Sequence, residues 1–195
     1  MKYRVSSLLL TVLLWCSPLV ATATVVLYMD LSEMTSVSQV IVHAKIVDSS
    51  VIQDADRPIT TRTTIEAIEV YKGKENFEKG RLWFDLLGGE RDGMQIRVPG
   101  TPTFRAGEEV ILFLEKNSTD YALCGLMQGV FRVQEEQKDK RVVSRDLSGA
   151  GYAQFGDNGK YSFMHDAPKG VTGYPLDSLK EEITLHVTAK KEVTP

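Results

Sequence analysis

Cysteine is almost absent from this chain of 195 residues, with one at position 16 and one at position 124. Cys16 lies in an amino-terminal segment that we expect to be removed, so the mature protein cannot form an intramolecular disulfide. One cysteine also cannot supply a structural zinc site. Cys124 follows the apolar residues Tyr121-Ala122-Leu123. We therefore expect a buried thiol that packs as a small hydrophobe, with a reactive or intermolecular thiol as the alternative.

The short motifs of common catalytic and metal sites are also missing. The three histidines, His43, His165 and His186, are not part of a His-Glu-x-x-His pair, and neither Gly-x-Ser-x-Gly nor the phosphate-binding Gly-x-x-x-x-Gly-Lys-Ser/Thr occurs. Glu108 and Glu109 are adjacent on a predicted strand, so their carboxylates should point to opposite faces and cannot flank one bond. We expect both to be solvated. The sequence therefore predicts a protein without cofactor, bound metal or enzymatic activity.

Long hydrophobic runs are limited to one, in residues 8–20. Lys2 and Arg4 precede this run and Ala21-Thr22-Ala23 follows it, which is the pattern of a cleavable signal peptide over residues 1–23. The run is shorter than the roughly 20 residues that span a bilayer, so we expect no stable membrane anchor after cleavage, although an uncleaved anchor is the alternative. The mature chain should begin at Thr24 and be secreted or periplasmic.

Basic charge is not in excess either. The full chain has 23 basic and 26 acidic residues, and removal of Lys2 and Arg4 leaves 21 basic residues and a net charge of −5. This balance argues against nucleic acid as a partner, because proteins that bind nucleic acid usually present an excess of Lys and Arg.

Residues 24–147 show the alternation of a β-barrel domain. In residues 40–47, Val40, Val42, Ala44 and Ile46 should share one face of a strand, while His43 and Lys45 share a solvated or half-covered face. The alternation in residues 61–71 slips, which predicts a β-bulge near Ala67. Five successive apolar residues predict that the strand at 110–114 is buried on both faces. Further strands are predicted at residues 81–86, 94–98, 121–126 and 130–133.

The remaining elements are two helices and a hairpin. Leu31, Met34 and Val37 indicate a short amino-terminal helix, and residues 148–195 should form a hairpin around Asp157-Asn158-Gly159 and a helix over residues 177–190. Apolar residues of this last helix recur every three or four positions, so it is amphipathic and should dock on the sheet, capped by Asp177 or Ser178. Membrane binding by this helix is the alternative. The predicted fold is mainly β, a partly open OB-like barrel with both helices.

Several segments carry a resemblance. Met29-Asp30-Leu31-Ser32-Glu33-Met34, Glu69-Val70-Tyr71-Lys72-Gly73, residues 100–114 and residues 125–133 together resemble a group of exported bacterial proteins of unassigned function. The order of strands, with Phe-Arg-x-Gly-Glu-Glu before an apolar strand, also resembles the OB-fold barrel of netrin-like and tissue-inhibitor-of-metalloproteinase domains. Those inhibitors chelate the protease zinc through a disulfide-fixed amino-terminal cysteine. The expected first residue here is Thr24, so the resemblance implies the barrel fold without the zinc-chelating cysteine.

Candidate binding residues are Tyr71, Trp83, Phe104 and Arg105, which are of types that interfaces enrich and lie at exposed-phase or loop positions. The alternative for Phe104 is a plug that closes the barrel end. The free amine of Thr24 could direct the chain to a metal, or the terminus could simply complete a sheet. We expect an exported, non-catalytic module that binds a secreted protein, with a protease as one such partner.

The alternative function is a secreted hydrolase with a site around Arg105, Glu108 and His165.

Overall fold

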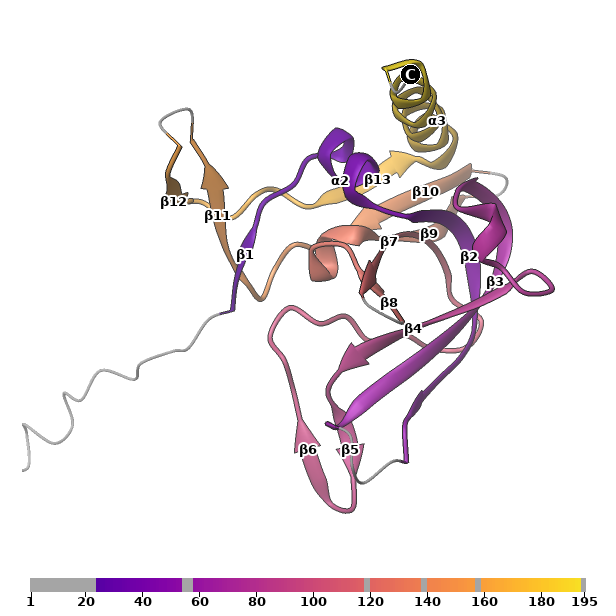
Figure 1. The fold of residues 1–195 in the computed structure, drawn as a ribbon, viewed down its shortest axis with the longest axis vertical. Helices are drawn as coiled ribbons and strands as arrows, with labels where there is room; N and C mark the ends of the chain where they lie inside the picture. The colour runs from indigo at the N-terminus through magenta and orange to yellow at the C-terminus, as the bar shows by residue number, and fades with distance from the viewer. Residues whose placement is uncertain (1–23, 54–57, 118–119, 138–139, 157–158, 194–195) are drawn as a thin grey trace, which may run out of the picture.

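The computed structural model describes residues 24–53, 58–117, 120–137, 140–156 and 159–193. The predicted signal peptide and the turn residues Asp157 and Asn158 lie outside these ranges. Figure 1 shows a mainly β fold, which confirms the predicted fold class. The strands are β1 (Val25–Leu27), β2 (Val40–Val51), β3 (Thr60–Lys72), β4 (Arg81–Leu87), β5 (Gly89–Arg91), β6 (Met94–Ile96), β7 (Glu109–Asn117), β8 (Asp120–Leu123), β9 (Val130–Gln137), β10 (Lys140–Arg145), β11 (Gly151–Phe155), β12 (Tyr161–Phe163) and β13 (Val171–Pro175). The helices are α2 (Leu31–Val37) and α3 (Leu176–Val193), with 3-10 turns at Lys74–Asn76 and Leu126–Gly129.

The main sheet has the strand order β13-β10-β9-β7-β2-β3-β4. In addition, β8 pairs with the C-terminal part of β7. Its pairings are antiparallel throughout. The sheet curls until β8 lies beside β4, but the described strands do not close it into a barrel. The predicted partly open β fold is therefore confirmed.

One face of the curled sheet encloses the first hydrophobic cluster. The predicted inward residues of β2 are all buried in it, and the apolar residues Leu82, Phe84 and Leu86 of β4 face them. Alternate residues of a strand point to opposite faces, so the intervening residues of β4 are directed away from this cluster. Burial of these apolar side chains provides the main driving force for the curl.

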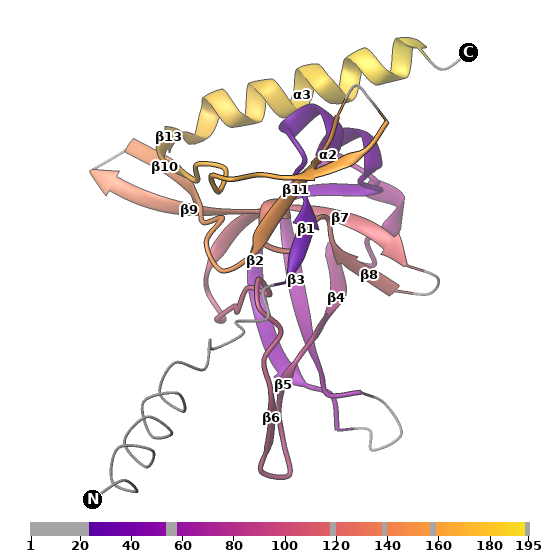
Figure 2. The ribbon, with the colours of Figure 1, turned by 90° about the vertical axis from the view of Figure 1, so that its left-hand side faces the viewer.

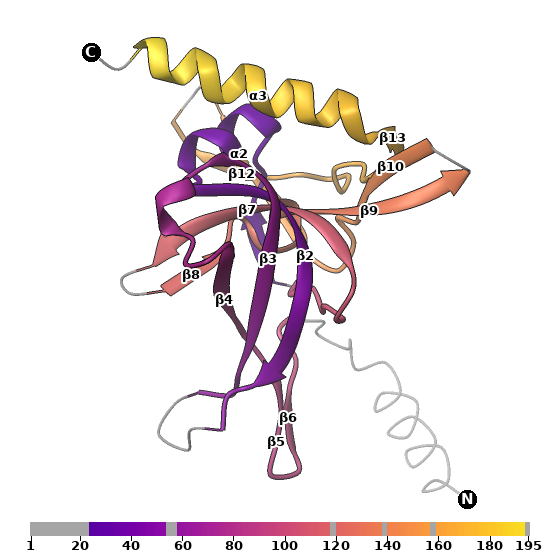
Figure 3. The same cartoon turned by 90° about the vertical axis from the view of Figure 1, so that its right-hand side faces the viewer.

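The opposite face is covered by both helices, and Figures 2 and 3 show α3 running across it. Met34 of α2 and Leu176, Leu179 and Ile183 of α3 pack there against Phe113 and its neighbours on the sheet. The apolar run of β7 is consequently buried on both sides, as predicted: its side chains alternate between the two clusters.

Local details agree with most of the sequence pattern. In the pairing of β2 with β3, His43 is opposite Glu69 and Ala44 is opposite Ala67, so Ile68 is an extra residue and the predicted bulge is present. Asp30 caps α2 in a reciprocal capping box with Glu33. The capping prediction for α3 is wrong, because that helix begins at Leu176 directly after β13 and so Asp177 lies within its first turn.

Two smaller sheets flank the main one. β1 pairs in parallel with β11, and β11 pairs antiparallel with β12. β1 therefore forms a sheet with the predicted hairpin. β5 and β6 pair only with each other and project as an arm, away from α3 (Figure 2). The predicted strand at 94–98 is therefore shorter and belongs to this arm. No helix among the described residues is long and apolar enough to cross a membrane.

Candidate functional site

A groove opens between the end of β4, the β5–β6 arm and the loop formed by residues 97–104. Its volume is about 700 Å³, which falls in the range of roughly 300–1,000 Å³ that is typical of ligand sites. The distal ends of β2 and β3 contribute a further wall. The groove is lined by Ser49, Val51, Thr61, Leu86, Leu87, Gly88, Gly89, Gln95, Ile96, Arg97, Val98, Pro99, Thr101, Pro102, Thr103 and Phe104.

Two adjacent glycines turn the chain from β4 into the arm. Gly88 and Gly89 have φ values of +109° and +133°, which side-chain-bearing residues rarely adopt. A Cβ on Gly88 would lie 2.8 Å from the carbonyl oxygen of Ile96. The Gly88 N–H donates to Ile59 O at 2.9 Å, and the Thr61 hydroxyl donates to Gly88 O at 2.8 Å. These contacts fix the arm against β3 and so define the groove.

The mouth of the groove is apolar and exposed. Leu87, the last residue of β4, is 60% exposed, and Ile96, the last residue of β6, is 40% exposed. Leu86 and Phe104 form the buried floor. Arg97 is an exposed cation at the rim. Soluble proteins expose single apolar residues routinely, but a group of them around a cavity marks a binding surface.

Phe104 was a candidate binding residue with a plug as the alternative, and the structure buries its side chain in the first hydrophobic cluster. Its ring packs edge-on against Phe84, with ring centroids 5.6 Å apart and an interplanar angle of 89°. The Arg132 guanidinium lies 5.4 Å from the centroid of the Phe104 ring and also donates to Glu108 at 2.5 Å. Phe104 is therefore held from both sides, and it contributes to the groove as part of its floor.

The other candidate residues are not assembled with it. Trp83 is exposed on β4 and stacks with Arg62, whose guanidinium carbon lies 5.7 Å from the centroid of the Trp83 ring. Arg105 is exposed in the loop before β7. Tyr71 packs beneath α3, on the other side of the sheet from Phe104. The four residues predicted to form one binding surface therefore lie in separate parts of the fold.

Thr24 directly precedes β1. Its carbonyl oxygen accepts a hydrogen bond of 2.8 Å from the N–H of Gly151, next to the parallel pairing of β1 with β11. This is the bonding expected of a terminus that completes a sheet, which was the alternative to a metal-directed terminus.

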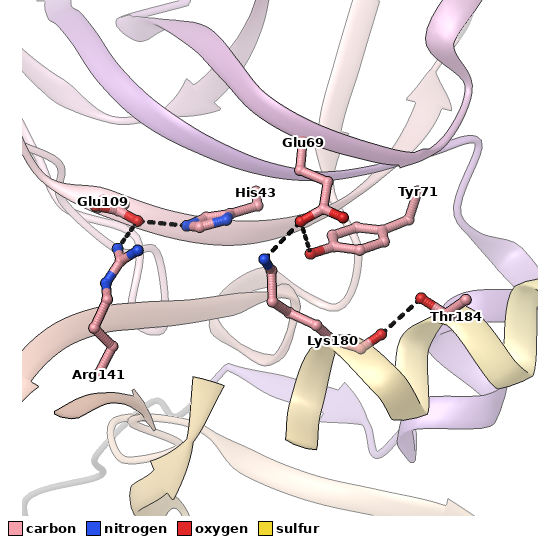
Figure 4. Close-up of polar contacts among 7 residues, drawn as sticks. All are labelled: His43, Glu69, Tyr71, Glu109, Arg141, Lys180 and Thr184. Carbon is pink, nitrogen blue, oxygen red and sulfur yellow. Dashed lines mark hydrogen bonds and ion pairs between the residues drawn. The ribbon is translucent and has the colours of Figure 1, made fainter. Parts of the chain in front are cut away.

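A polar network occupies the sheet face beneath α3 (Figure 4). His43 is only 1% exposed there, so the prediction of a solvated or half-covered position is wrong, because α3 covers this face. The Nε2 atom of His43 lies 2.5 Å from Glu109 Oε1, and Arg141 donates to the same oxygen. Glu109 is consequently paired rather than solvated, as is Glu108 on the opposite face. Burial, assisted by Lys180 and Arg141, lowers the pKa of His43 to about 4.

The second half of this network joins α3 to β3. Lys180 Nζ lies 2.7 Å from Glu69 Oε2, and the Tyr71 hydroxyl donates to the same oxygen at 2.9 Å. The hydrogen bond from Lys180, followed by that from Tyr71, lowers the pKa of Glu69. Burial and the Glu69 carboxylate raise the pKa of Tyr71. The groups of each set bond within that set, and none of them lines the groove. Lys180 is the residue of α3 among them, so its contact with Glu69 serves to orient α3.

The residues of the hydrolase alternative are likewise separate in their contacts. The Glu108 carboxylate bonds to Arg132, while His165 is exposed in the loop after β12. Within the described ranges, no group of three or more His, Cys, Asp or Glu side chains is placed to hold a metal ion. Cys124 is buried as predicted, 3.9 Å from the Met29 sulfur, and burial raises its pKa to about 11.

A scan of the chain against protein-family models and a search of curated proteins both found no match.

Proposed function

We propose that the protein is an exported, non-catalytic module that binds another secreted protein, and that the groove beside the β5–β6 arm is its binding site. The observation that carries the proposal is the combination of a cavity of about 700 Å³ with exposed Leu87 and Ile96 at its mouth. Binding would remove these side chains from water, which stabilises a complex by about 25 cal/mol per Å² of apolar surface.

The shape of the groove favours an extended polypeptide segment that inserts an apolar side chain. β4 is the terminal strand of the main sheet, and Gly88 directs its N–H toward Ile59. Backbone groups alternate in direction along a strand, so Leu87 directs its N–H and C=O away from β3 and toward the groove side. An extended segment there would combine backbone hydrogen bonds with an apolar pocket, as peptide-binding sheet edges do.

The proposed partner is secreted because the predicted signal peptide would export this chain, which then meets other exported proteins. A protease is the partner class that the resemblance of the barrel suggests. The contact would be made through the groove, because the carbonyl of Thr24 is already bonded within the β1–β11 pair.

Selection of a random peptide library on the mature protein tests the proposal without a known partner. We expect selected peptides to share an apolar residue, and to bind a Leu87→Asp variant at least about tenfold more weakly, because burial of one apolar side chain is worth about 1.5–3 kcal/mol. Leu185→Asp is the matched control, since Leu185 is a similarly exposed leucine that lies on α3.

Equal binding of the selected peptides to the wild type and to both Leu87→Asp and Ile96→Asp variants would contradict the proposal. Both side chains are exposed, so the variants should keep the melting temperature of the wild type.

A further inference from the structure

The sheet formed by β1, β11 and β12 has an exposed apolar face that the groove does not involve. In the strand register, Leu27 is opposite Ala153 and Ala153 is opposite Phe163, while Phe155 is opposite Tyr161. Paired residues project to the same side of a sheet, and so do residues two positions apart. One face therefore consists of Val25, Leu27, Ala153, Phe155, Tyr161 and Phe163.

The large side chains of this aromatic face are all exposed, Phe163 to 75%. The rings of Phe155 and Tyr161 contact each other edge-on, with centroids 5.0 Å apart. The opposite side of the same sheet is anchored, because Tyr152 is buried in a third hydrophobic cluster that Val26 joins. The sheet therefore cannot turn its aromatic face inward without removing Tyr152 from its own cluster.

We propose that the aromatic face is a contact surface for a phospholipid bilayer. The apolar run of residues 8–20 ends five residues before Val25, the first residue of β1. Five extended residues span at most about 18 Å, so a chain whose apolar run enters a bilayer holds this sheet at the membrane surface. The strand that follows the run, β1, contributes Val25 and Leu27 to the aromatic face.

The composition of the aromatic face suits the boundary between headgroups and acyl chains. Aromatic rings with a polar tip, such as Tyr161, favour this boundary, and the phenylalanines add apolar area. Residues 151–172 contain two lysines and two aspartates, so the hairpin region is neutral although residues 24–195 carry a net charge of −5. The hairpin is thus repelled less by anionic lipids than the rest of the acidic chain.

After removal of residues 1–23 the contact is reversible, because it rests on a few partly inserted side chains rather than on a spanning segment. The aromatic face would then keep the mature protein near the membrane across which it was exported. Figure 1 shows this sheet and the β5–β6 arm in separate regions of the molecule, so the groove stays accessible in the bound protein.

Co-sedimentation with vesicles tests the proposal on the mature protein, residues 24–195. Vesicles of phosphatidylethanolamine and phosphatidylglycerol should bind the wild type, and Phe155→Ser/Phe163→Ser should weaken the partition by about tenfold or more. Leu185→Ser is the control, since it removes an equally exposed leucine from α3 and should bind as the wild type does. The single variant Phe163→Ser, on the edge strand β12, provides a second test with less change to the hairpin.

Absence of vesicle binding by the wild type would overturn the proposal, as would equal binding of the wild type and a folded Phe163→Ser variant. A third outcome would also overturn it: if the mature protein is a dimer without vesicles and Phe163→Ser makes it monomeric, the face binds a second copy of the chain. None of these results bears on the groove, because peptide binding is measured without lipid.

Discussion

Replacement of Ile183 by alanine tests the docking of α3 on the sheet. The Ile183 side chain is completely buried between the helix and the sheet, among Met34, Phe113 and Leu179. Removal of its outer carbon atoms should destabilise the protein by about 2–5 kcal/mol, which combines lost burial with the cavity left behind. Alanine is the best helix former, so the helix itself is not weakened and the loss reports tertiary packing.

The loss can be measured by urea unfolding of the mature protein, followed by tryptophan fluorescence. For a domain of 172 residues the same loss lowers the melting temperature by about 4–20 °C. Leu185 is two positions further along the same helix and is 69% exposed, so Leu185→Ala should change stability by less than about 0.5 kcal/mol. If Ile183→Ala is no more destabilising than Leu185→Ala, α3 does not dock through this side chain and the account of the covered sheet face is wrong.

Three further outcomes are expected. Leu112→Ala in β7 should cost about 2–5 kcal/mol in unfolding free energy, and a loss well below 1 kcal/mol would place β7 at an exposed edge. The pKa of His43 is lowered from 6.5 to about 4, so the folded state disfavours the protonated ring. The contribution of the neutral ring to the free energy of unfolding is therefore complete above about pH 6.5. It declines by about 3 kcal/mol as the pH falls to 4. Unfolding measured across this range should show a shallower pH dependence for His43→Gln, and an unchanged slope would contradict the burial of a neutral ring. One residue added before Thr24 should leave the melting temperature of the mature protein and any protease inhibition unchanged. Loss of zinc-protease inhibition would instead support the hypothesis that the amine of Thr24 is directed at a metal.

Elements whose own residues carry the pattern could be predicted from the sequence. The five apolar residues of β7 required two covered faces, and the apolar spacing of α3 required a surface to cover one side of it. The helix and the strand meet each other's requirement, because the apolar side of α3 packs on one face of β7. The slipped alternation of β3 likewise located its bulge.

The environment of His43 could not be predicted in this way. Alternation placed His43 and Lys45 on the same polar face of β2, and only the docking of α3, more than 130 residues later, buries the first and leaves the second exposed. Phe104 illustrates the same limit, because it lies in a loop rich in proline and glycine and is fixed by Phe84 and Arg132 from distant parts of the chain.

The groove depends on three segments that meet only in the fold: the end of β4, the arm and residues 97–104. Two adjacent glycines such as Gly88-Gly89 indicate a turn, but a turn does not show which apolar residues remain exposed after it. Leu87 and Ile96 were consequently absent from the predicted binding residues, although they form the mouth of the groove.

Chemical-shift mapping with a selected peptide tests the central claim most directly. When the peptide is titrated into the isotope-labelled mature protein, the account predicts that the largest backbone shifts fall on Leu87, Ile96 and residues 97–104, around the groove. Shifts confined to β1, β11 and β12, with those groove residues unchanged, would contradict the claim that the groove is the protein-binding site.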